Sequence, residues 1–284
     1  MKRWMLSLVL LGALVIGYAT LMPTSKSIVV VIPSYNNAHW YEKNLSRLFS
    51  QTYKNWRAIY IDDCSTDGTA DLVEQYIKKQ GQSHRVRLIK NETNKGALAN
   101  IYHAVYSCAD RDIIVLLDGD DWFHTDEALS IVAKAYEDES VWMTYGQFVE
   151  YPYGKKGFCC PIPREVIEKN AYRNYTWITS HLRTFYTWLF KKIKTEDLMY
   201  NGDFFSVTWD MAIVFPLLEM AGGRCKFIPE VLYEYNMATP LNDFKTKLQL
   251  QQHCNRLIRQ RPRYAPLKEP ALRTPHVDEW WKRA

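Results

Sequence analysis

Cysteine is sparse in this chain, with six residues among 284. So few cysteines in a chain of this length exclude a scaffold held together by disulfides, and none of them shows the paired spacing of a structural metal site. Apolar residues, in contrast, make up 47% of the sequence. This content excludes a disordered protein, a collagen-like fibre and a low-complexity scaffold. The sequence therefore predicts a globular core, in one large domain or two small ones.

A strong excess of charge is also missing from most of the chain. The formal net charge is +5, which would permit a nucleic acid or an anionic membrane as a partner. Residues 242–284, however, contain ten Lys and Arg but only four Asp and Glu, so the rest of the chain is nearly neutral. We therefore expect no nucleic-acid partner. We interpret residues 242–284 as a basic C-terminal tail, helical over 244–259, that packs on the domain, lies on an anionic membrane surface or is solvated.

The N-terminus carries the features of a membrane segment. The run Trp4–Met22 is mostly apolar, contains no charge and follows the basic residues Lys2 and Arg3. About 19 residues at a rise of 1.5 Å span roughly 28 Å, close to the ~30 Å hydrocarbon core of a bilayer. We therefore predict a cytoplasmic stub and a transmembrane signal-anchor helix within residues 1–26.

The charges beside this segment predict its orientation. Lys2 and Arg3 keep the N-terminus cytoplasmic by the positive-inside rule, which predicts a single-pass membrane protein. The domain that follows would then lie in the ER or Golgi lumen if the source is eukaryotic. Two alternatives remain: a cleaved signal peptide with the shorter apolar core Met5–Ile16, and a membrane enzyme that faces the cytoplasm.

Strands and helices alternate in the next part of the chain. The predicted strands are Ser27–Ile32, Trp56–Ile61, Val86–Lys90 and Ile113–Leu117. The predicted helices between them are His39–Gln51, Ala70–Lys79 and Ala97–Ala109. Short continuous apolar runs are typical of strands that are buried on both faces of a parallel sheet. The pattern therefore predicts parallel βαβ units with right-handed crossovers.

Polar clusters follow three of these strands. They are Pro33–Asn37, Asp62–Asp63 and Asp118–Asp121. Ligands of open α/β sheets bind beyond the carboxyl ends of the strands. We therefore expect the three clusters to meet at one binding site.

The acidic cluster indicates the chemistry of this site. Asp118 and Asp120 alternate along an extended segment, so both can face one ion, while Gly119 between them permits the close approach of a ligand. Carboxylates so close repel one another and raise each other's pKa unless a cation lies between them. Their hard oxygens favour Mg²⁺ or Mn²⁺, shared with a diphosphate, over zinc. The alternative is a solvated acidic turn.

The second half of the chain supplies further candidates. Asp210 precedes an apolar helix, Ala212–Ala221, in which Pro216 predicts a kink. At this point Asp210 is either an N-cap, stabilised by the helix dipole, or a general base. His181 and Arg183 lie among aromatic residues and can donate hydrogen bonds to hydroxyl or phosphate groups.

Each of these candidates has more than one interpretation. His181 is a sugar contact, a third metal ligand or a structural histidine. Arg183 contacts the donor or the acceptor. Trp209 packs beneath an acceptor sugar or belongs to the core.

An ordered set of motifs resembles the family 2 glycosyltransferases of GT-A fold. The set consists of Val30–Asn36, Gln51–Tyr53, Asp62–Thr69, Asn94–Gly96 with Asn100, and Asp118–Asp121. The resemblance covers roughly Ser27 to Asn236. It implies an α/β domain over residues 27–241, with a Rossmann-like, mostly parallel nucleotide-binding sheet.

The resemblance also implies roles for individual residues. Pro33, Ser34, Tyr35 and Asp63 would hold the nucleotide base. Some members carry a basic residue just after the Tyr-Asn pair, which contacts the phosphates. This chain has Asn37 at that position, so we assign the phosphate contact to Lys95 instead.

The acidic residues are matched in the same way. Asp118 and Asp120 would bind the ribose and a divalent metal, Mn²⁺ or Mg²⁺, with Asp121 as a further candidate ligand. Asp210 matches the general base of the family, an acidic residue before a helix well downstream of the acidic pair.

The sequence thus predicts a metal-dependent inverting glycosyltransferase of hexosyl- or N-acetylhexosaminyl-transferase type. It would move a sugar from a nucleotide-sugar donor, UDP-linked, to a hydroxyl acceptor on a glycan, lipid or protein. One alternative is a nucleotidyltransferase, although that class would want a basic, glycine-rich loop that Pro33–Asn37 lacks. The other is an inactive nucleotide- or carbohydrate-binding module.

Overall fold

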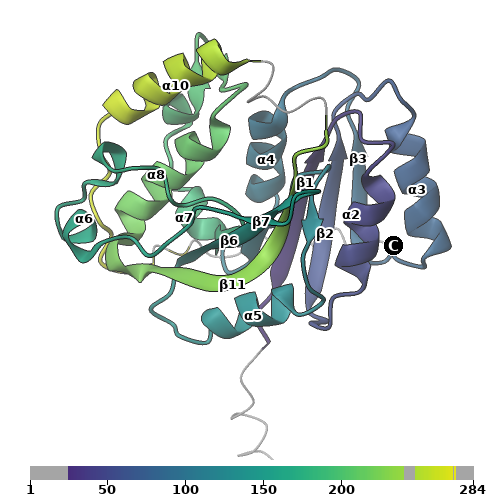
Figure 1. The fold of residues 1–284 in the computed structure, drawn as a ribbon, viewed down its shortest axis with the longest axis horizontal. Helices are drawn as coiled ribbons and strands as arrows, with labels where there is room; N and C mark the ends of the chain where they lie inside the picture. Colours follow the sequence, from purple (N-terminus) through teal and green to yellow (C-terminus); the bar gives the residue numbers. More distant parts are fainter. Residues whose placement is uncertain (1–24, 240–246, 271, 273–284) are drawn as a thin grey trace, which may run out of the picture.

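A sheet of nine strands forms the centre of the molecule (Figure 1). The computed structural model describes residues 25–239, 247–270 and 272. The strands of this sheet are β1 (Ile28–Ser34), β2 (Trp56–Asp62), β3 (Val86–Lys90), β4 (Ile113–Leu116), β5 (Trp122–Phe123), β6 (Met143–Tyr151), β7 (Lys155–Lys156), β8 (Arg183–Tyr186) and β11 (Cys225–Asn236). Their order is β3-β2-β1-β4-β8-β6-β11-β5, with β7 paired to β6.

Helices cover both faces of this sheet (Figure 1). The α-helices are α2 (Tyr41–Phe49), α3 (Thr69–Lys79), α4 (Ala97–Tyr106), α5 (Ala128–Ala135), α6 (Arg164–Glu168), α7 (Thr187–Phe190), α8 (Trp209–Ala221) and α10 (Leu248–Gln260). Three short 3₁₀ helices are η1 (Tyr172–Asn174), η2 (Thr195–Leu198) and η3 (Gly222–Arg224). The hairpin of β9 (Met199–Tyr200) and β10 (Asp203–Phe204) forms a separate two-stranded sheet.

The strands and helices predicted for the first half of the chain are confirmed. Each of the seven is present, and its ends differ from the prediction by no more than three residues. β1 is buried at every position and runs parallel to both neighbours, β2 and β4. Its side chains alternate between two cores, one shared with α4, α7 and α8 and the other with α2, α3 and α5.

The second half of the sheet is mixed, whereas the sequence predicted a mostly parallel sheet. β8 is antiparallel to both β4 and β6, and β11 is parallel to β6 but antiparallel to β5. Parallel neighbours need a long crossover, usually a helix, whereas antiparallel neighbours do not. Between β6 and β8 the chain forms the short β7, α6 and η1, and β8 then joins the sheet in the antiparallel direction.

The strand order creates a crevice beside β1. The chain proceeds outward from β1 to β2 and β3 and then returns to the other side of β1 as β4. The connections that follow β1 and β4 therefore leave in opposite directions. In open α/β sheets such a switch point is where ligands bind. Pro33–Asn37 and Asp118–Asp121, the polar clusters after β1 and β4, are thereby brought to the same edge.

Helix α8 passes through the core of the second half. Pro216 does not end the helix, which continues to Ala221, and residues 211–221 are all buried. Glu219 on this helix is fully buried and forms a bidentate ion pair with Arg173, at 2.6 and 2.9 Å. Arg173 also donates to the carbonyl of Ile258 in α10 at 2.5 Å. This buried pair thus joins α8, η1 and α10.

The described part of the basic tail packs on the domain. Arg259 donates to the carbonyl of Arg173 at 2.6 Å, and Arg224 donates to the carbonyl of Leu267 at 3.2 Å. Of the three arrangements considered for the tail, packing is therefore the one that residues 247–270 adopt. The predicted helix 244–259 is observed as α10, although its first three residues lie outside the described part.

The predicted membrane segment Trp4–Met22 also lies outside the described residues. Within the part of the chain that the structure describes, no helix combines the length and the hydropathy needed to span a bilayer.

Replacing Glu219 with alanine tests the buried ion pair. The change leaves the buried Arg173 guanidinium without a counter-charge, and we expect the free energy of unfolding to fall by about 3–5 kcal/mol. Urea denaturation measures this loss. The matched control is Glu168→Ala, which removes an exposed i,i+4 pair with Arg164 and should leave the midpoint nearly unchanged. Equal midpoints for the two variants would contradict the assigned role of the buried pair.

Candidate active site

A cavity of about 790 Å³ lies over the carboxyl ends of β1 and β4. Every residue predicted for the site lines it, with the exception of Lys95. These residues are Pro33, Ser34, Tyr35, Asp63, Asp118, Asp120, Asp121, His181, Arg183, Trp209 and Asp210. The structure therefore brings together side chains that come from both halves of the sequence.

The loop after β1 packs closely against the acidic cluster. The Ser34 hydroxyl accepts hydrogen bonds from the Tyr60 hydroxyl at 2.8 Å and from the Asn37 amide at 3.0 Å. A Cβ atom on Gly119 would lie 2.6 Å from the Ser34 Cβ. The absence of a side chain at Gly119 is thus required by the approach of the β1 loop, whereas the sequence had suggested the approach of a ligand. Tyr35 follows on this loop and exposes 41% of its surface at the cavity.

Asp63 organises the loop that leads into α4. One carboxylate oxygen accepts the Lys95 backbone N–H at 2.9 Å and the Asn91 side-chain amide at 2.8 Å. The other accepts the Gly96 backbone N–H at 2.8 Å. Lys95 itself is exposed and does not line the cavity. Base binding by Asp63 and phosphate binding by Lys95 stay predictions.

The acidic cluster is held from two sides by neutral donors. Asn44 of α2 is fully buried and donates to the carbonyls of Asp118 at 3.0 Å and Asp121 at 2.7 Å. From β11, the Tyr233 hydroxyl donates to one oxygen of Asp121 at 2.6 Å, and the Asn236 backbone N–H donates to the other at 2.7 Å. None of the three donors was predicted from the sequence, since each lies far from the acids in sequence and belongs to no motif.

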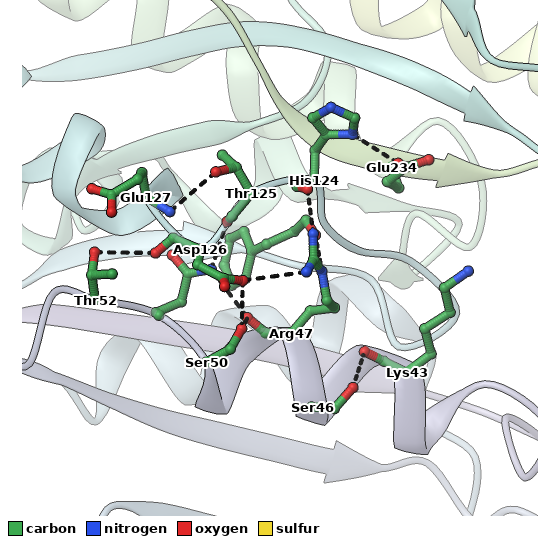
Figure 2. Close-up of polar contacts among 12 residues, drawn as sticks. Lys43, Ser46, Arg47, Ser50, Thr52, His124, Thr125, Asp126, Glu127 and Glu234 are labelled. Atoms are coloured by element: carbon green, nitrogen blue, oxygen red, sulfur yellow. Dashed lines mark hydrogen bonds and ion pairs between the residues drawn. The ribbon is translucent and has the colours of Figure 1, made fainter.

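Further contacts fix the chain just after the acidic cluster (Figure 2). Arg47 of α2 donates to the carbonyls of Phe123 and His124 and pairs with Asp126 at 3.3 Å. His124 in turn contacts Glu234 of β11 at 2.7 Å. The segment that leaves the cluster is thus tied to the same two elements, α2 and β11, that hold the cluster itself.

Burial and mutual repulsion act on the carboxylates. Burial and the neighbouring Asp120 carboxylate raise the pKa of Asp118 to about 7, although the nearby Arg183 partly opposes this change. Burial, with Asp120 and Asp118 as like-charged neighbours, also raises the pKa of Asp121 well above its usual range. Both groups therefore favour a bound cation or a proton near neutral pH.

Three side chains could together hold a metal ion. The ligand atoms of Asp118, Asp121 and His181 all lie within 4.8 Å of one another. Burial, together with Arg183, lowers the pKa of His181 well below its usual range, so its imidazole is neutral, as a metal ligand requires. Two carboxylates and one imidazole form a mixed oxygen and nitrogen ligand set for a divalent cation. Asp120 lines the same cavity but lies outside this group, so its part in metal binding stays a prediction.

Asp210 lies in the first turn of α8. The N-cap position belongs to Thr208, so Asp210 is not the cap that the sequence left open. Its carboxylate accepts a hydrogen bond from Arg183 at 3.1 Å, and 26% of its side chain is exposed, against 4% for Arg183. The Nε of Arg183 is buried and has no acceptor among the described residues. Arg183 thus holds Asp210 in the cavity and keeps one N–H for a ligand or water.

Other lining residues belong to no motif and were not predicted from the sequence. Phe148, Glu150, Phe158, Tyr235, Leu248, Gln251, Gln252 and Asn255 belong to this group. Most of them come from β6, β11 and α10, which the sequence did not place near β1. Only the fold reveals that they share the cavity.

The chain belongs to glycosyl transferase family 2, because residues 29–207 match the sequence pattern that defines this family. A related protein is the UDP-Glc:alpha-D-GlcNAc-diphosphoundecaprenol beta-1,3-glucosyltransferase WfgD of Escherichia coli. It is 34% identical over 92 residues, which cover 32% of this chain and 34% of WfgD. The chain spans about a third of the length of the curated relatives it matches.

Solved structures support the GT-A fold. TarS of Staphylococcus aureus, solved in complex with UDP-GlcNAc, matches with a TM-score of 0.58 and 17% identity, over 82% of this chain and 65% of TarS. The mannosyltransferase PcManGT of Pyrobaculum calidifontis, in complex with GDP-Man and Mn²⁺, matches with a TM-score of 0.53 and 20% identity, over 84% of this chain and 65% of PcManGT. The predicted GT-A fold is thereby confirmed, with a mixed sheet.

The raised pKa of Asp118 predicts a stability change for Asp118→Asn. The native pKa of about 7 exceeds the ordinary value of an aspartate, 3.8. The ionised group therefore costs stability above pH 7, and this cost declines as the pH falls from 7 towards 4. Without metal at pH 8, we expect the variant to be more stable by about 1–3 kcal/mol. Urea denaturation in EDTA measures this gain.

Two further measurements test whether charge repulsion causes this gain in stability. The advantage of Asp118→Asn should shrink at pH 5.5, and Mn²⁺ at pH 8 should stabilise the wild type more than the variant. Asp203→Asn, a change at an exposed position in β10, is the control and should have no effect. A variant that is less stable than the wild type at pH 8 would disprove the assigned repulsion.

Proposed function

We propose that this chain is a metal-dependent inverting glycosyltransferase that moves a sugar from a UDP-linked donor to an acceptor hydroxyl on a glycan, lipid or protein. One observation carries the proposal: a single cavity contains both the acidic cluster at the switch point and the Asp210 carboxylate, which Arg183 holds in place. Metal-assisted binding of a diphosphate and deprotonation of a hydroxyl need these two features in one site.

The donor end of the cavity is assigned to the β1 loop and the acidic cluster. Tyr35 offers an exposed ring for a nucleotide base, next to Pro33 and Ser34. Family membership supports a nucleotide-sugar donor. TarS, whose fold is similar to that of this chain, was solved in complex with the nucleotide sugar UDP-GlcNAc. The divalent ion, held by Asp118, Asp121 and His181, would stabilise the negative charge of the departing nucleoside diphosphate.

Asp210 is assigned as the general base. Its carboxylate takes the proton of the acceptor hydroxyl while that oxygen forms a bond with the anomeric carbon. The bond between the anomeric carbon and the diphosphate oxygen breaks in the same displacement, so the configuration inverts. Arg183 keeps the carboxylate directed into the cavity through its 3.1 Å hydrogen bond.

Family membership favours this function over the nucleotidyltransferase alternative. The inactive binding module, the remaining alternative, differs from the enzyme only in turnover. Replacement of the assigned base therefore distinguishes the two.

Asp210→Asn tests the proposed chemistry. The amide cannot accept the proton, so we expect turnover to fall about 100- to 10,000-fold while UDP binding in the presence of Mn²⁺ is retained. Release of the nucleoside diphosphate, UDP or GDP, from a panel of UDP- and GDP-sugars measures turnover, and calorimetry with UDP measures binding. Asp203→Asn, which lies outside the cavity, should retain wild-type turnover. Unchanged turnover in Asp210→Asn would contradict the assignment of Asp210 as the general base.

The proposal includes membrane attachment through Trp4–Met22, with the N-terminus in the cytoplasm. Apolar helices of this length stay in the bilayer under conditions that strip peripheral proteins. We expect the full-length chain to remain in membranes after washing with alkaline carbonate, and a chain without residues 1–24 to be released. Recovery of a shortened protein in the soluble fraction would indicate a cleaved signal peptide instead.

A further inference from the structure

Helix α10 contributes one wall of the cavity. Its residues Leu248, Gln251, Gln252 and Asn255 line the cavity, and their spacing places them on one face of the helix. We call them the α10 face. The helix follows the family match, which ends at residue 207. Figure 1 shows it beside α8, the helix that begins with Trp209 and Asp210. The α10 face therefore lies outside the segment that matches the family pattern.

The α10 face is polar but carries no charge. It consists of one leucine and three amides, although the helix also contains Arg256 and Arg259. Among the described residues, the side-chain amides of Gln251 and Gln252 form no hydrogen bond with another residue. An amide both donates and accepts, as sugar hydroxyl groups do. These two side chains are therefore free to bind an uncharged hydroxylated ligand.

Other contacts hold the helix rigidly in this orientation. The side of the helix next to this face buries Cys254 and Ile258 in the core. The carbonyl of Gln251 accepts a hydrogen bond from the Thr208 hydroxyl at 3.3 Å, and Thr208 directly precedes α8. The α10 face is thus connected to the start of α8, where Asp210 lies two residues after Thr208. A ligand on this face would be held on the side of the cavity that contains the proposed base.

The rest of the lining fits a sugar better than a phosphate. Trp177, Trp209 and Phe158 line the same cavity, and aromatic faces pack well against the C–H faces of sugars. Arg183 is the one Lys or Arg among the described lining residues, and it is already paired with Asp210. An acceptor phosphate in this part of the cavity would therefore meet carboxylates without a cation of its own.

We propose that the α10 face is an acceptor subsite for a neutral saccharide, and that Gln251 and Gln252 hydrogen-bond its hydroxyl groups. The subsite rests on the proposed transferase function, since the bound saccharide supplies the hydroxyl that Asp210 deprotonates. It narrows the acceptor from glycan, lipid or protein to an uncharged sugar at the reacting end.

The test separates acceptor binding from donor chemistry. UDP-Glc, UDP-Gal, UDP-GlcNAc and GDP-Man serve as donors, and release of the nucleotide is followed with Mn²⁺ present. Acceptor probes are the methyl glycosides of glucose, galactose, mannose and N-acetylglucosamine, each compared with the matching sugar 1-phosphate. We expect at least one methyl glycoside to accelerate release, and the matching 1-phosphate to be at least tenfold weaker.

The double variant Gln251→Ala/Gln252→Ala then tests the assigned residues. Loss of two hydrogen bonds should raise the half-saturating concentration of the methyl glycoside at least tenfold. Slow release without acceptor should stay within twofold of the wild type. The control is Gln249→Ala, which removes the same amide from an exposed position of α10 outside the cavity and should change neither quantity.

The outcomes distinguish the subsite from the function on which it rests. Donor hydrolysis without a response to any neutral glycoside, a preference for the 1-phosphates, or an unchanged half-saturating concentration in the double variant overturns the subsite alone. No hydrolysis of any donor by the wild type contradicts the proposed function, and the subsite with it.

Discussion

Burial of several carboxylates at the end of β4 is the constraint on which the rest of the structure depends. Asp118 and Asp121 lose solvation and repel each other and Asp120, as their raised pKa values indicate. Such a cluster persists only if neutral donors hold its backbone and side chains in place. Those donors are Asn44 from α2 and Tyr233 and Asn236 from β11. The long return of the chain to β11 is therefore part of the site.

The irregular register of β11 also helps to hold the acidic cluster in place. Its register against β6 shifts between Ile228 and Val231 and again between Val231 and Tyr233. Such irregularities redirect the side chains that follow them and are frequent beside active sites. Here they precede Tyr233, which donates to Asp121 and stacks against His181 with ring centres 4.3 Å apart. One strand thereby positions a carboxylate and the imidazole beside it.

Local patterns were sufficient to predict the first half of the fold and the acidic cluster. Strands such as Ile28–Ser34 are continuous apolar runs that end in polar turns, so their burial on both faces is visible in the sequence. β8 is too short for a periodic signal, and β11 alternates irregularly and contains Pro229. Their pairing depends on distant partners, which no local pattern encodes.

The same reasoning separates the predicted from the missed site residues. Acids that share a motif, such as Asp118 and Asp120, are recognised together because one strand end presents both. Asn44 lies 74 and 77 residues before the carbonyls it binds, and Tyr233 lies 112 residues after Asp121. Each is an ordinary residue of its helix or strand. Only tertiary packing gives it a role at the site.

The basic character of the C-terminal segment can be understood from the contacts of its arginine residues and from the negative charge of the site. Arg259 and Arg261 direct their guanidinium groups to main-chain carbonyls, those of Arg173 and Met199 among others. Their charge is thus used to attach α10 and the following residues to the domain. A Lys or Arg on the cavity side of α10 would instead be drawn to the carboxylates and would compete with a metal ion for them. Neutral amides at those positions leave the acidic cluster available to a cation, which explains how a basic helix can border an acidic site.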